Sequence, residues 1–282
     1  MIQERQPQAR TKRFSLKFWG LVALVLSVLT AALLYGYQYR QLTAPQRLFT
    51  VAVKQDNRGN IAAAQEGYRD IYQHYPRSPE AAEALLRLGK IWQYDRRDGQ
   101  RALLCYLQLE YDYPDSLLVV PARQEAAKIV KYTLKDYLRA IEFYQQLLDL
   151  NTSLSDQYYY EIADCYFRLK NYSQARIELE ILLENYPDSE LIPEVLLRKG
   201  EFLLLEGLES AAQQDWQSLI EQYPDSPLQL QARFNLAKLL EENGSLDEAL
   251  QRYRQIEGFP YPELLHQKIS HLERRIAEKT GV

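Results

Sequence analysis

Residues 186–189 of the chain read Tyr-Pro-Asp-Ser, and the same four residues return at 223–226. The dipeptide Tyr-Pro also occurs at 75–76, 113–114 and 261–262, so that successive prolines lie 38, 73, 37 and 38 residues apart. Proline ends a helix because it lacks a backbone N–H and crowds the preceding turn. The Asp-Ser that follows offers side-chain oxygens to cap the next helix. Because 73 is close to two periods, the spacing predicts a solenoid of paired helices.

A second break separates the two helices of each period, most clearly at residues 243–248 (NGSLDE). Gly244 can take the left-handed C-cap conformation, Ser245 the N-cap, and Glu248 would complete a capping box. We therefore predict six helical hairpins, at residues 45–76, 79–114, 117–151, 155–187, 190–224 and 227–260. A strongly charged final helix at 262–279 is expected to cover the apolar face of the last hairpin.

Small residues recur at a fixed spacing inside these hairpins. A small residue is followed by a second one 12 positions on, by an aromatic 4 later, and by proline 24 after the first. The hairpins that follow this spacing best begin their pattern at Ala52, Ala163, Gly200 and Ala237. Two hairpins need one extra residue, from Gly89 to Ala102 and from Ala127 to Ala140. Small side chains are expected here because the two helices of a hairpin cross closely.

This pattern resembles the tetratricopeptide repeat family over residues 45–262, nearly all of the chain beyond its N-terminal apolar run. The resemblance implies an all-α, right-handed solenoid that binds other proteins and is not an enzyme. The Tyr-Pro-Asp-Ser signature is similar to that of bacterial envelope members of the family. These include the barrel-assembly lipoprotein, the division-coordinating protein of the Tol–Pal system and the ancillary subunit of the Sec translocon.

The N-terminal region predicts a membrane anchor. Residues 18–37 contain no charge, and at 1.5 Å per residue a helix of this length spans roughly 30 Å, the thickness of the hydrocarbon core. Residues 1–17 hold five Lys or Arg against one Glu, whereas only Arg40 and Arg47 follow the run closely. The positive-inside rule then places the N-terminus in the cytoplasm and the repeats in the periplasm, on an inner-membrane protein.

The apolar run could instead be a cleaved signal peptide, an alternative that Thr30-Ala31-Ala32 keeps open. The run is longer than the usual 7–15 residues, and tyrosines follow it where small residues should precede cleavage, so an uncleaved anchor is favoured. The expected organisation is a cytoplasmic segment at 1–17, a transmembrane helix at 18–37, a linker at 38–44, the solenoid at 45–261, and a capping helix with its tail at 262–282.

The residues give no support to catalysis or to a bound cofactor or metal. His266 and His271 are five positions apart, about 140° around a helix, which is poor geometry for chelation. Phosphate-binding loops, nucleophile elbows and HExxH are absent from the sequence. A formal net charge of −4 argues against a nucleic-acid partner, and no small-molecule substrate is expected. Cys105 and Cys165 are interpreted as small buried hydrophobes.

The concave face of the solenoid, lined by the first helix of each hairpin, is the predicted protein-binding groove. Counted from the small residues, the groove-facing positions are Phe49, Val53, Leu86, Lys90, Gln124, Lys128, Tyr160, Asp164, Phe167, Leu197, Glu201, Leu204, Phe234, Lys238 and Glu241. Some of these aromatic side chains, such as Phe49 and Phe234, could instead pack against neighbouring helices. An apolar groove with scattered charge suits a peptide segment held by side-chain anchors.

The expected function is therefore that of a membrane-anchored scaffold or adaptor in an envelope assembly or a translocon-associated complex. Two alternatives stay open. The solenoid could be a structural or oligomerisation subunit of a membrane complex, or it could be a periplasmic chaperone for unfolded chains. The partner itself cannot be named from the residues, because a fold does not determine a function.

Overall fold

The computed structural model describes residues 16–150 and 153–280, and statements on side chains exclude residues 16–20, 22, 41–42 and 280. Within these ranges the chain is helical and contains no strand. The chain divides into two compact units, Met1–Leu118 and Val119–Val282, which we call unit 1 and unit 2. The predicted all-α solenoid fold is confirmed, whereas the predicted domain boundaries stay predictions.

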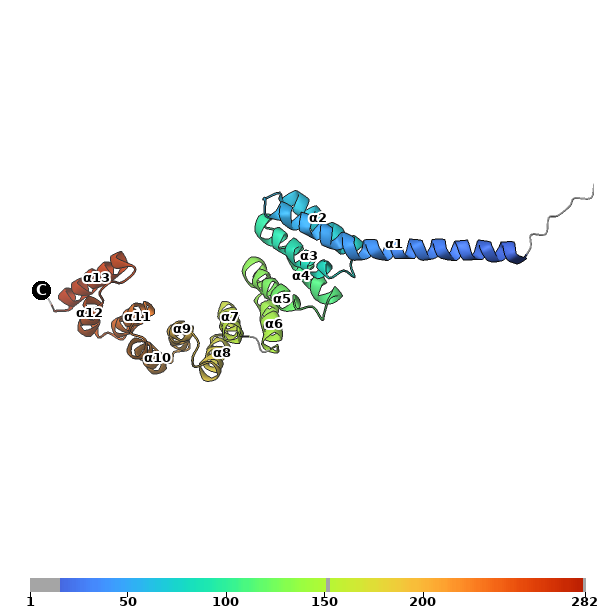
Figure 1. The fold of residues 1–282 in the computed structure, drawn as a ribbon. Helices are drawn as coiled ribbons and strands as arrows, with labels where there is room; N and C mark the ends of the chain where they lie inside the picture. Colours follow the sequence, from blue (N-terminus) through green and yellow to red (C-terminus); the bar gives the residue numbers. More distant parts are fainter. Residues whose placement is uncertain (1–15, 151–152, 281–282) are drawn as a thin grey trace, which may run out of the picture. The chain divides into compact units, whose positions relative to one another are not determined.

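Unit 1 contains two hairpins. Its elements are α1 (Leu16–Asp56), α2 (Ile61–His74), α3 (Glu80–Lys90), the π-helical η1 (Ile91–Asp95) and α4 (Gly99–Asp112). The helices α1 and α2 pack together, as do α3 and α4 (Figure 1). Tyr68 and Ile71 of α2 are fully buried against Ala52 of α1 and Leu88 of α3. The apolar stripe of α2 therefore joins the two hairpins.

The N-terminal half of α1 extends past α2 as a single helix (Figure 1). Its large apolar side chains are exposed, for example Leu24 at 63% and Leu33 at 74%. In the part of the chain that the structure describes, no helix is both long enough and apolar enough to cross a membrane. The predicted span at 18–37 includes side chains that lie outside this description, and it stays a prediction, as does the cytoplasmic segment at 1–17, of which residues 1–15 lie outside it.

The expected linker at 38–44 is helical and belongs to α1. Its sequence, QYRQLTA, contains neither Gly nor Pro, so nothing in it ends the helix. Pro45, expected near the start of the first hairpin, lies inside the helix. One helix therefore runs from the apolar N-terminal run into the repeats.

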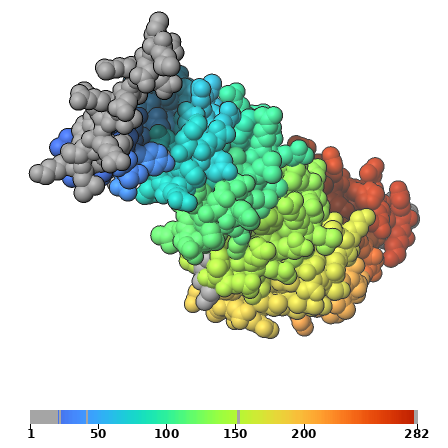
Figure 2. Space-filling view, turned by 90° about the vertical axis from the view of Figure 1, so that its right-hand side faces the viewer, coloured from blue at the N-terminus to red at the C-terminus, as the bar shows by residue number. Residues whose placement is uncertain are grey.

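Unit 2 continues the pattern with four hairpins and a final helix. Its elements are α5 (Val119–Lys128), the π-helical η2 (Ile129–Leu134), α6 (Tyr137–Leu148), α7 (Ser155–Arg168), α8 (Tyr172–Asn185), α9 (Ile192–Leu205), α10 (Glu209–Gln222), α11 (Leu228–Glu242), α12 (Leu246–Arg254) and α13 (Pro262–Thr280). Each helix packs against the next one along the chain. In Figure 2 the surface of this unit passes from green through yellow to red in sequence order.

The Tyr-Pro-Asp-Ser segments lie just before the next helices, but the N-cap residues of α9 and α11 are Leu191 and Pro227, and neither helix has a side-chain cap. The hydroxyls of Ser189 and Ser226 accept hydrogen bonds from the N–H groups of Leu191 and Leu228, at 3.2 and 3.3 Å. These contacts lie at the starts of α9 and α11, where backbone N–H groups have no partner within the helix. The same signature therefore begins the first helix of two successive hairpins.

The capping box predicted at residues 243–248 does not form. Gly244 has φ +81 and so adopts the expected left-handed conformation. Ser245 stands at the N-cap position of α12, but its side chain forms no capping hydrogen bond. Glu248 pairs instead with Arg252 one turn later, at 3.8 Å. Glu248 therefore forms an i,i+4 ion pair on the exposed face instead of accepting a hydrogen bond from the backbone N–H of Ser245.

Small residues lie where the paired helices approach closely, as the spacing predicts. A Cβ atom on Gly89 would lie 2.4 Å from the Tyr106 ring, and one on Gly200 would lie 2.4 Å from Nε1 of Trp216. The two hairpins that need an extra residue are the two that contain the π-helical segments η1 and η2. A π turn accommodates one inserted residue, so the irregular spacing has a structural counterpart.

Candidate functional site

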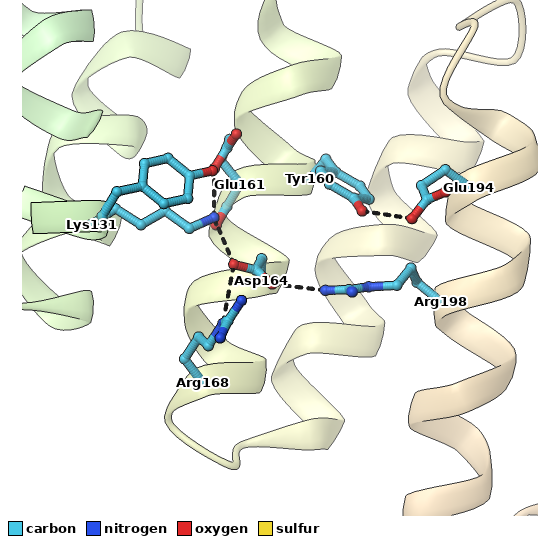
Figure 3. Close-up of polar contacts among 8 residues, drawn as sticks. Lys131, Tyr160, Glu161, Asp164, Arg168, Glu194 and Arg198 are labelled. Atoms are coloured by element: carbon cyan, nitrogen blue, oxygen red, sulfur yellow. Dashed lines mark hydrogen bonds and ion pairs between the residues drawn. The ribbon is translucent and has the colours of Figure 1, made fainter. Parts of the chain in front are cut away.

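A network of ion pairs joins the first helices of three successive hairpins in unit 2 (Figure 3). Nζ of Lys131, on η2, lies 2.8 Å from Oδ2 of Asp164 on α7 and also pairs with Glu161. Oδ1 of Asp164 accepts a hydrogen bond of 2.7 Å from Arg198 on α9. Arg168 approaches the same carboxylate at 3.6 Å. Asp164 is therefore surrounded by three cations.

The charges of this network are held in place by burial and by their partners. Burial by itself would raise the pKa of Asp164, but the hydrogen bond and charge of Lys131, together with the charges of Arg168 and Arg198, hold the pKa below its ordinary value. Burial also opposes the charge on Lys131, yet Glu161 and Asp164 raise its pKa above the ordinary value. Both groups are therefore ionised near neutral pH, and the network is a fixed structural element.

Arg198 is also held by aromatic rings. Its guanidinium carbon lies 5.5 Å from the ring centre of Phe167, 5.7 Å from that of Phe202 and 6.0 Å from that of Tyr160. Cation–π contacts of this length are attractive, most strongly away from water. The Tyr160 hydroxyl donates to Glu194 of α9 at 3.1 Å. These contacts fix α7 against α9 on the predicted groove side.

A pocket of about 270 Å³ lies next to this network. Phe167 of α7 and Trp216 of α10 form part of its wall, and α9 contributes Glu201, Leu204 and Leu205. The helix α11 closes it with Asn235, Lys238, Leu239 and Glu242. Its inner wall is apolar, whereas charged groups lie among its lining. We call it the Leu204 pocket.

The charged side chains of the Leu204 pocket differ in whether they have an oppositely charged partner close by. Lys238 pairs with Glu242 on the same helix at 3.4 Å. Among the described residues, the Glu201 carboxylate takes part in no hydrogen bond or ion pair. Burial raises the pKa of Glu201 above its ordinary value, and the nearby charges of Arg198 and Lys238 offset this only in part. The pocket therefore contains one carboxylate that lacks a close cationic partner.

Four of the predicted groove residues meet at this pocket: Phe167, Glu201, Leu204 and Lys238. Tyr160 and Asp164 belong to the neighbouring network. In unit 1, Lys90 is exposed, and Phe49 is half-buried beside Tyr68, with Arg87 over its ring. The groove assignment as a whole stays a prediction.

Five of the predicted groove residues are buried, and one of them is Asp164 of the ion-pair network. Leu86 and Leu197 are 5% and 6% exposed and belong to the core between helices. Phe234 stacks on Phe259 at 4.8 Å between ring centres, because the segment after α12 folds back over it. The Glu241 carboxylate is covered by α13, whose Lys268 and Arg275 approach it at 2.9 and 3.4 Å. In this structure Phe234 and Glu241 serve the C-terminal cap, and their side chains offer little surface to a partner.

Several residues of the site could not be read from the repeat spacing. Arg198 precedes its marker glycine by two positions, which is off the counted face. Lys131 stands four residues after Ala127, which is a counted position, but the predicted set omitted it. Leu205, Asn235 and Glu242 line the pocket from positions adjacent to the predicted ones. Successive residues of a helix lie about 100° apart, so a pocket between helices also takes in neighbours of the counted residues, and those neighbours were the available signal.

Other chemical groups contribute little. Among the described residues, no cluster of three or more His, Cys, Asp or Glu side chains is arranged to hold a metal ion. Cys165 is buried and Cys105 half-buried, and both are free thiols. Burial raises the pKa of Cys105 to about 11 and that of Cys165 to about 12, so both thiols are protonated at neutral pH.

The fold defines a helical-hairpin repeat scaffold of a kind suited to protein–protein interaction. Residues 157–189 and 210–262 match two tetratricopeptide repeat family models. These two segments are therefore similar to tetratricopeptide repeats, and the helical-hairpin fold of the chain is similar to that of such proteins. None of the curated proteins matches the chain in sequence.

Several solved structures share the fold. A tetratricopeptide repeat protein from Parabacteroides merdae has 16% identity and a TM-score of 0.53, over 81% of this chain and 98% of its own. PilW, a type IV pilus biogenesis factor, has 16% identity and a TM-score of 0.51, over 80% and 98%. PilF from Pseudomonas aeruginosa has 18% identity and a TM-score of 0.51, over 81% and 97%. At these identities the likeness concerns the fold alone.

Proposed function

We propose that this chain is a membrane-anchored scaffold that binds a segment of a partner protein in the groove lined by α7, α9 and α11. The observation that carries the proposal is the Leu204 pocket, which brings four groove-facing side chains from three successive hairpins to one place. A partner segment that crosses these helices can insert a side chain there, while the ion pairs around Asp164 hold the helices in register.

Membrane attachment through residues 18–37 is the second part of the proposal. It is supported by the charge-free run and by the basic residues that precede it. The exposed apolar side chains along the N-terminal half of α1 agree with it, because a helix that is apolar on all sides is unfavourable in water. The same charge asymmetry supports a periplasmic location for the repeats and hence a role in an envelope assembly.

The role in the envelope also draws on one likeness of fold. PilW is described as a type IV pilus biogenesis factor, and its helical array resembles this one. The likeness is one of fold alone, so the proposal for this chain rests on its own N-terminal charge pattern and on its pocket.

Site-specific photo-cross-linking in native membranes tests the groove. A benzoylphenylalanine at Leu205, which is 53% exposed at the pocket, should capture a discrete partner. The matched control is the same group at Ile177, which is 38% exposed on α8 and does not line the pocket. Combining the Leu205 probe with Leu204→Ser should abolish the product. A cross-link that persists in this variant would show that the groove is not the binding site.

Carbonate extraction followed by protease protection tests the anchor. The full chain should stay with the membrane pellet, and its repeats should be digested only after the outer membrane is opened. Release of the intact chain by carbonate would overturn the anchoring, and repeats that stay protected until the inner membrane is lysed would overturn the periplasmic location.

A further inference from the structure

We infer that the partner segment held at the Leu204 pocket is basic: it inserts an apolar side chain into the pocket and pairs an adjacent Lys or Arg with Glu201. This inference rests on the proposed groove function and adds the chemical class of the partner. Three features of unit 2 support it: the compensation of charge in the groove, the shape of the pocket and the overall charge of the unit.

Other carboxylates along this face of unit 2 already have hydrogen-bond or ion-pair partners. Asp164 is paired with Lys131, Arg168 and Arg198, and Glu241 with Lys268 and Arg275. Glu194 accepts from the Tyr160 hydroxyl, and Glu242 pairs with Lys238. Glu201 differs from these, since within the described groove its carboxylate has neither a hydrogen bond nor an ion pair.

The cations nearest to Glu201 are engaged elsewhere. Arg198, one turn before it on α9, donates to Asp164 at 2.7 Å and lies over three aromatic rings. Lys238 is held by Glu242. A half-buried carboxylate whose neighbours are committed gains most from a cation that arrives with a ligand, because the pair then forms at a partly desolvated site.

The shape of the pocket places its carboxylate beside an apolar wall. Leu204 and Leu205 lie one turn after Glu201 on α9, so the carboxylate and the apolar wall lie along one helix. A volume of about 270 Å³ is below the range usual for pockets that hold a whole cofactor or drug-sized ligand, and it suits one large apolar side chain. The pocket can therefore recognise two neighbouring residues of the partner segment, an apolar side chain and a cation next to it.

Unit 2 as a whole is negatively charged. Residues 119–282 hold 18 Lys and Arg against 27 Asp and Glu, a formal net charge of −9. Such a field attracts a basic segment and repels an acidic one over roughly 8 Å at physiological ionic strength. It also disfavours a second copy of unit 2 as the occupant. An acidic segment would in addition set a carboxylate beside Glu201 and Glu242.

Peptide selection on the full chain in lipid nanodiscs tests the inference. A library of random 12-residue peptides is selected for binding, and peptides that no longer bind Leu204→Ser are retained. We expect these to contain Leu, Phe, Ile or Met next to Lys or Arg. For the strongest of them, Glu201→Gln should weaken binding by about tenfold, corresponding to about 1.4 kcal/mol, and should reduce the dependence of binding on salt.

The matched control is Glu184→Gln, which removes the same charge from an exposed position on α8 outside the pocket. It should leave the affinity within about twofold, because exposed charges are screened. If pocket-dependent peptides are selected but show no basic preference, are acidic, or bind Glu201→Gln equally well, the inference is overturned and the groove function stands. If no selected peptide depends on Leu204, the groove function and the inference fail together.

Discussion

The Lys131 ammonium group lies 2.8 Å from the Asp164 carboxylate, and both side chains are almost entirely removed from water, at 2% and 10% exposure. The two residues are 33 positions apart, in neighbouring hairpins. Attraction between buried charges is strong, but each charge loses its hydration. Removing one member of the pair therefore leaves a buried charge without a partner and destabilises the fold. The pair therefore fixes the register of η2 against α7, and a disturbance here should spread to both hairpins.

Removing the cation of this pair should destabilise unit 2 strongly. In Lys131→Met the carboxylates of Asp164 and Glu161 lose their shared partner, and a loss of about 3–5 kcal/mol is expected when one member of a buried pair is removed. Urea denaturation followed by circular dichroism measures it. Lys128→Met is the control, because Lys128 is 52% exposed and pairs with Glu125 on the same helix. Equal losses in the two variants would contradict a role for burial.

The acid dependence of stability should report the Asp164 carboxylate. Its pKa in the folded chain lies below the ordinary value of 3.8, because the effect of burial is outweighed by the hydrogen bond and charge of Lys131 together with the charges of Arg168 and Arg198. A carboxyl whose folded pKa is lowered stabilises the fold above its unfolded pKa, and this contribution is lost as the pH falls through the folded value. The difference in unfolding free energy between the wild type and Asp164→Asn should therefore be largest near pH 6–7 and should shrink below about pH 4. A difference that stays constant down to pH 3 would contradict this assignment.

Much of the fold is predictable from the residues because its signals are local. Proline after tyrosine ends a helix, and the serine two positions later accepts from a backbone N–H just before or at the start of the next one, as Ser189 and Ser226 do. Phe167 and Leu204 could be placed near the pocket because each stands four residues after a small residue at which two helices cross. A fixed spacing along a helix determines a face, and so the phase alone brings such residues together.

Other parts of the site depend on contacts that no local pattern encodes. Lys131 stands four residues after Ala127, as Phe167 and Leu204 stand after their small residues, but no local pattern pairs it with Asp164 in the next hairpin. Phe234 has the phase of a groove residue but is covered by Phe259, from the segment that follows α12. The helix through 38–44 likewise follows from the absence of any helix-ending residue, which the expectation of a linker overlooked.

Because α9 and α10 approach closely at Gly200, we expect Gly200→Ala to destabilise the chain, the opposite of its usual effect in a helix. In an open helix interior Gly→Ala stabilises by about 1 kcal/mol. In Gly200→Ala the new Cβ would lie 2.4 Å from Nε1 of Trp216, a buried side chain that donates to the Leu197 carbonyl at 3.1 Å. We therefore expect a loss of about 1–3 kcal/mol from overpacking.

A double-mutant cycle separates this effect from helix propensity. Trp216→Phe should also destabilise the chain, but adding Gly200→Ala to it should cost little more, because the smaller ring leaves room for the methyl group. Thermal unfolding of the four proteins gives the coupling free energy. Additive effects would show that the Trp216 ring is not what excludes a side chain at position 200.

The C-terminal helix should be required for the stability of the last hairpin. Leu272 of α13 is fully buried in a cluster with Phe234, Tyr253 and Phe259, so Leu272→Ala should cost about 2–4 kcal/mol through lost burial and the cavity it leaves. Leu264, on the same helix but 42% exposed, provides the control, and its change to alanine should cost less than about 0.5 kcal/mol. Limited proteolysis should then cut Leu272→Ala first within α11–α13, since a solenoid without its cap opens from the end. Cleavage that begins elsewhere in unit 2, at an unchanged rate for α13, would show that this helix does not cap the array.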